Sequence, residues 1–92
     1  MKFFANLSAT LLTAGISGII VDEFYGVIAG MAGGAIFAVL LILILALDDA
    51  KVALAGGVVG LIIMAIFYIV DPISLIIVAA FSMILIPLDR FL

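Results

Sequence analysis

The sequence contains no cysteine, no histidine and no tryptophan. Without cysteine it forms no disulfide, and without cysteine and histidine it lacks the usual ligands of zinc and the commonest general base. It also shows no phosphate-binding loop and no pairing of a nucleophile with a base. We therefore expect a protein that is not an enzyme and that carries no catalytic cofactor and no metal.

Charge is scarce as well, since charged residues make up 10% of the 92 residues and the net charge is −3. No basic run indicates binding to nucleic acid or to anionic lipid. Hydrophobic residues make up 71% of the chain, and the mean hydropathy is +1.74. Because soluble domains have about 45–50% apolar and about 25% charged residues, we expect most of the surface to contact lipid or other copies of the chain.

The positions of the charges divide the chain into apolar segments. No charged residue occurs within 3–21, 24–47, 52–70 or 73–88. A charge at the centre of a bilayer costs about 2.5–3.5 kcal/mol on the insertion scale, so such segments are typical of membrane helices. We predict an all-α fold of membrane-derived hydrophobic hairpins, in one domain covering 1–92.

The expected helices, three to four in number, cover about 3–21, 24–47, 50–70 and 72–87. As a helix, 24–47 reaches roughly 36 Å, which exceeds the hydrocarbon core of about 30 Å, whereas 73–88 reaches only about 24 Å. Segment 3–21 contains several Ser, Thr and Asn residues. It can face a partner or the interface as readily as it can span the bilayer, and we expect it to be a retained first helix.

Carboxylates and a proline stand where these helices are expected to begin. Asp71 and Pro72 have the pattern of an N-cap followed by the first helical residue, because the carboxylate accepts unpaired amides and proline lacks one. Asp22 is expected to cap the second helix, and Asp48 or Asp49 the third. Asp71 also admits another interpretation, as a buried carboxylate that binds an ion or a proton.

Four helices would place the basic residues on one side of the membrane. The N-terminus, the loop 48–51 and the C-terminus would share this side, which favours cytoplasmic termini. The basic residues of this side are Lys2, Lys51 and Arg90, and the acidic residues of the other side are Asp22, Glu23 and Asp71.

Two rows of small residues lie at helical spacing in the second and third expected helices. Such rows let helix backbones approach closely in a membrane. They can pack the hairpin of one chain or join one copy to another. The rows are Gly26, Gly30 and Gly34, followed by Ala53, Gly56, Gly57 and Gly60.

Large apolar side chains occupy the opposite faces of the same two segments. We expect them to contact lipid acyl chains or other subunits. The residues concerned are Phe37, Leu41, Ile44, Ile63 and Phe67.

A modest first helix, a glycine-rich helix, a short charged loop and a second glycine-rich helix follow one another. This order resembles the major pilins of conjugative (mating) pili, the type IV secretion pilin family. The run Lys51-Val-Ala-Leu-Ala-Gly-Gly-Val-Val-Gly-Leu-Ile-Ile-Met64 is similar to the last helix of these pilins, and Tyr25–Gly30 is similar to the start of the preceding one. The resemblance covers roughly 24–70. The further apolar segment 73–88 and the acidic hairpin loop make the pilins of archaeal DNA-import systems the most similar.

The resemblance implies a structural pilin that polymerises with bound membrane lipid into a hollow pilus for DNA transfer or import between cells. Its partners would be other copies, membrane lipids and the secretion or import machinery. DNA would be a transported cargo that is not specifically bound. The chain would reside in the cell membrane before assembly and at the cell surface afterwards. Asp48, Asp49 and Lys51 would line the lumen.

Two other functions are compatible with the same sequence. One is a small oligomeric transport subunit, such as a rotor proteolipid, which would need Asp71 in the middle of the bilayer as its ion-binding carboxylate. The other is an accessory subunit of a larger membrane complex, which would purify with different chains rather than with itself.

Overall fold

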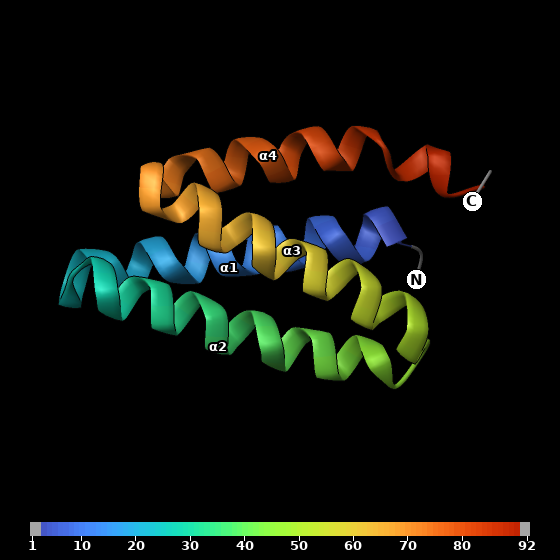
Figure 1. The fold of residues 1–92 in the computed structure, drawn as a ribbon, viewed down its shortest axis with the longest axis horizontal. Coiled ribbons are helices and arrows are strands. Elements are labelled where there is room, and N and C mark those ends of the chain that lie inside the picture. The colour runs from blue at the N-terminus through green and yellow to red at the C-terminus, as the bar shows by residue number, and fades with distance from the viewer. Residues whose placement is uncertain (1–2, 91–92) are drawn as a thin grey trace.

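The computed structural model describes residues 3–90 and contains four α-helices and a short 3₁₀ helix over this range, with no strand. The all-α prediction is therefore confirmed. The elements are α1 (Phe3–Tyr25), α2 (Val27–Ala46), α3 (Ala50–Val70), α4 (Pro72–Ile84) and the 3₁₀ helix η1 (Ile86–Arg90) (Figure 1).

The helices run back and forth along the long axis of a molecule that measures 40 × 25 × 16 Å. Figure 1 shows that α1 begins and η1 ends at the same end as the α2–α3 loop. The α1–α2 and α3–α4 turns lie at the opposite end. Lys51, in the first turn of α3, therefore lies at one end, and Asp22, Glu23 and Asp71 lie at the other, as a four-helix topology requires.

The first helix is the centre of the fold. It packs against α2, α3 and α4, whereas no contact joins α2 to α4 within the described residues. Its buried leucines and alanine form the core together with side chains from the other three helices. The core residues are Leu7, Leu11, Ala14, Ala38, Met64, Tyr68, Leu75 and Ala79.

Polar side chains of α1 are buried in this core. The Thr10 hydroxyl donates a hydrogen bond of 2.8 Å to the Asn6 carbonyl, and the Ser8 hydroxyl donates one of 3.0 Å to the Ser82 hydroxyl of α4. Such pairing is expected in an apolar interior, where a hydroxyl without a partner costs free energy. The polar side of α1 therefore packs against helices of the same chain, which is compatible with a helix that also spans the bilayer.

Three of the predicted helix ends differ from the structure by three or four residues. α1 continues past 21 to Tyr25, α2 begins only at Val27, and α4 ends at Ile84 rather than 87. Proline lacks an amide hydrogen and clashes with the preceding turn, so the α-helix stops before Pro87 and the chain continues as η1. The predicted range 50–70 agrees with α3.

Three helices of the described part of the chain, α1, α2 and α3, are long and apolar enough to cross a membrane. Their length and composition place the chain among membrane-associated proteins. α4 has 13 residues and is apolar but shorter than a span.

Candidate functional site

The glycines of α2 lie against the backbone of α1. A Cβ atom built on Gly34 would lie 2.7 Å from the Ala14 carbonyl oxygen, and one built on Gly30 would lie 2.7 Å from the Gly18 carbonyl oxygen. Neither position leaves room for a side chain, so α1 and α2 approach closely. Gly30 and Gly34 thus act in packing within the chain.

The small residues of α3 contact both earlier helices. A Cβ atom on Gly56 would lie 2.9 Å from Asn6 Cβ, and one on Gly60 would lie 2.8 Å from Thr10 Cγ2, both in α1. Gly57 instead lies against Ile42 of α2. Ala53 is also buried, with 1% of its surface exposed. The row on α3 therefore packs against other helices of the same chain, and these contacts bury most of its surface.

Tyr68 of α3 joins three helices at one point. Its hydroxyl donates a buried hydrogen bond of 3.1 Å to the Gly18 carbonyl of α1, and it lies directly against Gly30 of α2. Its exposed fraction is 1%. The sequence analysis did not find this role, because the sequence shows no signal that pairs Tyr68 with glycines 38 and 50 positions away.

Two of the predicted site residues have other roles than expected. Gly26 was expected in the small-residue row, but it is the exposed N-cap of α2, and no atom lies within 4 Å of a Cβ built there. Its φ of +100° permits the reversal between α1 and α2. Asp22 was expected to cap α2, but it lies inside the last turn of α1, and α2 has no side-chain cap. The reversal needs a residue that adopts a positive φ, and that residue is Gly26, so α1 continues through Asp22.

The other expected caps occur where the sequence places them. The Asp71 carboxylate accepts a hydrogen bond of 3.0 Å from the Ile73 amide, and Pro72 begins α4. Asp49, rather than Asp48, is the N-cap of α3, and its carboxylate accepts a bond of 3.3 Å from the Val52 amide. These bonds satisfy amides at helix starts that would otherwise lack a partner.

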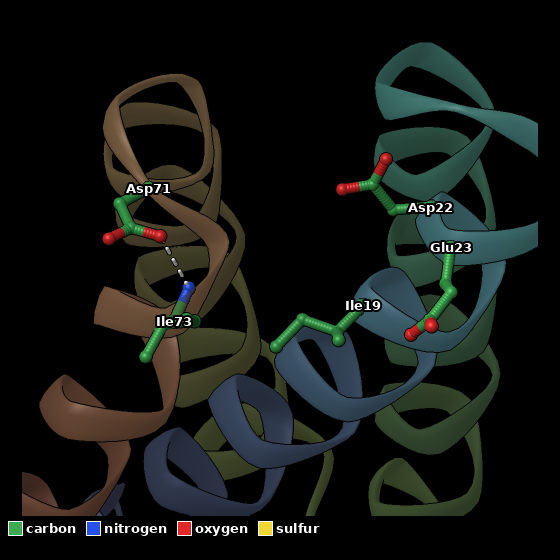
Figure 2. A pocket seen from close by; sticks show the side chains of 5 residues that line it. All are labelled: Ile19, Asp22, Glu23, Asp71 and Ile73. Atoms are coloured by element: carbon green, nitrogen blue, oxygen red, sulfur yellow. Dashed lines mark hydrogen bonds between the residues drawn. The ribbon is translucent and has the colours of Figure 1, made fainter.

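The acidic end of the molecule carries a shallow open hollow of about 320 Å³. Figure 2 shows its lining residues, with Asp22 and Glu23 on the end of α1 and Asp71 at the α3–α4 turn. Ile19 and Ile73 complete the lining. No group of three or more acidic side chains in the part of the chain described is placed to hold a metal ion. Its three carboxylates make the hollow an acidic end surface.

The opposite end carries the α2–α3 loop with Asp48 and Asp49, and the first turn of α3 with Lys51, so the loop predicted at 48–51 ends before Ala50. Asp48, Asp49 and Lys51 are all exposed there, next to Leu47, which has 88% of its surface exposed. These three charged residues form one cluster, which we call the loop cluster. It is available to water or to another molecule.

The residues expected to contact lipid lie mostly on the outside. Phe37, Ile44 and Phe67 are exposed, whereas Leu41 and Ile63 are half-buried. Ile63 packs against the core with part of its surface. The lateral surface of α2 and α3 is thus apolar, and no chain segment described here covers it.

No protein-family model, curated protein or solved structure matches this chain.

Proposed function

We propose that the chain is a structural pilin, which polymerises with bound membrane lipid into a hollow, conjugation-like pilus for DNA transfer between cells. It resides in the cell membrane before assembly and at the cell surface afterwards. Its partners are further copies, lipids and the membrane machinery that extracts it. DNA passes as a cargo that is not specifically bound.

One observation carries the proposal. After the chain has packed all four helices against one another, its lateral surface is still apolar around α2, α3 and α4. A surface of this kind needs lipid or other copies on every side. The exposed residues that form it include Ile36, Leu40, Ile62, Ile66, Ile77 and Phe81.

The internal use of the glycine rows fits a preformed subunit. Gly34 and Gly60 pack inside one chain. Contacts between copies are therefore made by the larger side chains and by the lipid between them. The subunit can then leave the membrane as one folded unit with its lipid. The resemblance of 24–70 to mating pilins points in the same direction.

The transport alternative has less support. A rotor carboxylate would have to lie in the middle of a helix and of the bilayer, whereas Asp71 is exposed at the end of the bundle and caps α4. An accessory subunit of a larger complex remains the second candidate, since an apolar lateral surface also suits different partner chains.

Imaging of sheared surface filaments tests the proposal. Filaments collected from cells that express the chain would be imaged by cryo-electron microscopy, with mass spectrometry of protein and lipid. We expect thin tubes built of this chain alone, with lipid in the wall. Recovery of the chain only in the membrane fraction, with other proteins in fixed ratio, contradicts the pilin and supports the accessory subunit.

A charge change in the loop cluster tests the proposed lumen. An acidic wall repels DNA phosphates, so replacing Asp48→Lys is expected to make DNA adhere and to slow transfer. Asp48 is the residue to change because Asp49 caps α3, and loss of that cap would cost about 1 kcal/mol. Asp49→Asn removes charge but keeps a good cap. The measurement is the frequency of DNA transfer by cells with intact pili. An unchanged frequency in the double variant Asp48→Lys/Asp49→Asn contradicts a lumenal loop.

A further inference from the structure

The apolar surface of the subunit ends at charged residues at both ends of the molecule. The acidic end, with Asp22, Glu23 and Asp71, bounds it on one side, and the loop cluster bounds it on the other. Within the described residues, no charged side chain occurs in the helical stretches between these two ends. Since a charge inside the hydrocarbon core is costly, the two ends define the thickness of an apolar belt.

The four segments that run through this apolar belt have nearly the same length. The uncharged parts of α1 and α3, 3–21 and 52–70, each reach about 28 Å. α2 has 20 residues and reaches about 30 Å. α4 is shorter, but η1 continues it towards the end that carries the α2–α3 loop (Figure 1). As an α-helix followed by a 3₁₀ helix, 73–88 reaches about 26 Å. The apolar belt is thus about 28 Å thick.

The structure makes the apolar belt thinner than the sequence alone indicates. The uncharged run 24–47 would reach roughly 36 Å as one helix. However, Tyr25 is the last residue of α1, Gly26 makes the reversal, and Leu47 lies beyond the last residue of α2. Tyr25 and Leu47 have 79% and 88% of their surface exposed. They therefore lie at the ends of the bundle, where a tyrosine suits the boundary between lipid and water.

Tilt and assembly change this thickness little. Membrane helices are tilted by about 20° on average, which shortens the projection of such a belt by only about 2 Å. A copy that covers one lateral side carries a belt of the same thickness. The outermost surface of any assembly in the membrane therefore needs the same lipid, whichever sides are covered by further copies.

We propose that the chain binds preferentially to phospholipids of intermediate acyl-chain length, in a sterol-poor bilayer with a hydrocarbon core of about 28 Å. A bilayer rich in sterol and sphingolipid has a core of about 32–33 Å, which would bring hydrocarbon over the charged ends. A much thinner bilayer would leave apolar turns of the helices in water. The inference names the lipid partner of the proposed function in its membrane-resident state, and it does not require a filament.

Tryptophan fluorescence tests this match, because the chain has no tryptophan of its own. Phe37→Trp places a probe near the middle of α2, and Phe81→Trp places one on α4. Both positions are exposed, to 51% and 65%. Each full-length variant would be reconstituted with brominated dioleoyl phosphatidylcholine, which quenches the fluorescence, in competition with dimyristoleoyl, dioleoyl or dierucoyl phosphatidylcholine. We expect the dioleoyl lipid to bind about twofold or more tightly than the shorter and the longer one.

The matched control is Leu47→Trp, at the end of the molecule that carries the loop cluster. This position is more exposed than Phe37, 88% against 51%, so the protein does not shield it from a quencher. It lies about 15 Å further along the helix direction, whereas the bromine atoms lie in the middle of the acyl chains. We therefore expect weak quenching. Equal quenching of Phe37→Trp and Leu47→Trp would place the loop cluster inside the hydrocarbon core and overturn the match.

The remaining outcomes separate the lipid match from the pilus. Affinity that rises steadily to the dierucoyl lipid, or that does not depend on chain length, overturns the match. Absence of quenching in both Phe37→Trp and Phe81→Trp also overturns it, because protein then covers both sides. If sheared filaments form while affinity rises steadily with chain length, the pilin stands and the match is wrong. A preference for the dioleoyl lipid in a chain that forms no filaments supports the match and contradicts the pilus.

Discussion

Replacing Gly34 by alanine is expected to destabilise the subunit by roughly 2–3 kcal/mol, although alanine is the better helix former. The added Cβ would lie 2.7 Å from the Ala14 carbonyl oxygen and 3.3 Å from Gly18 Cα, and both of these are backbone atoms that no rotamer change can move. Forcing atoms into a packed core costs about 1–3 kcal/mol even when side chains give way. The gain in helix propensity of about 1 kcal/mol does not offset a displacement of α1 from α2.

The matched control is Gly15→Ala, the same change at another buried helical glycine. There the new Cβ would lie 3.3 Å from Leu75 Cβ and 3.4 Å from Ile76 Cγ1, so a shift of a few tenths of an ångström in α4 is sufficient. The helix gain then balances the cost, and we expect a change of less than about 1 kcal/mol. The free energy of unfolding in mixed micelles, followed by circular dichroism, is the measurement. Equal effects at Gly34 and Gly15 would show that the α1–α2 approach is looser than these distances indicate.

Helix existence could be predicted from the sequence because charge marks the ends of apolar segments. Asp49 and Asp71 are local signals: each carboxylate accepts an amide two or three residues later in the same chain. A local interaction of this kind depends on neighbouring residues alone. The bounds of α3 follow from both, and they agree with 50–70.

The turn between α1 and α2 could not be placed in the same way. Asp22 and Glu23 looked like a boundary, but their carboxylates are compatible with the last turn of a helix that runs to Tyr25. The reversal depends on the φ of +100° at Gly26, and that glycine also fits the four-residue spacing of Gly30 and Gly34. A packing glycine and a turn glycine look alike in a sequence, because both are selected for the lack of a Cβ.

The partner of each glycine row is a tertiary property. A row of small residues predicts a close approach but leaves open which helix approaches. The central position of α1 and the role of Tyr68 depend on contacts across 50 residues. The polar residues of 3–21 were the signal in the sequence for the central position of α1. A less apolar helix is the one that the other helices shield from lipid.

Replacing Gly26 by L-alanine is expected to cost about 1–3 kcal/mol for a reason opposite to that at Gly34. No atom lies within 4 Å of the new Cβ, so there is ample space. The cost comes from the backbone, because φ +100° with ψ 172° is a conformation that only glycine adopts readily.

D-alanine at position 26 separates these causes, since a D-residue favours the mirror-image dihedral angles and adds the same methyl group. A chain assembled by chemical ligation with D-alanine is therefore expected to unfold at the wild-type detergent fraction, while the L-alanine chain unfolds earlier. If both chains lose stability equally, the methyl group itself is harmful and the turn is covered by something in the folded state. If neither loses stability, the α1–α2 reversal does not depend on a positive φ, and the close contact of α2 with α1 must orient the hairpin without help from its turn.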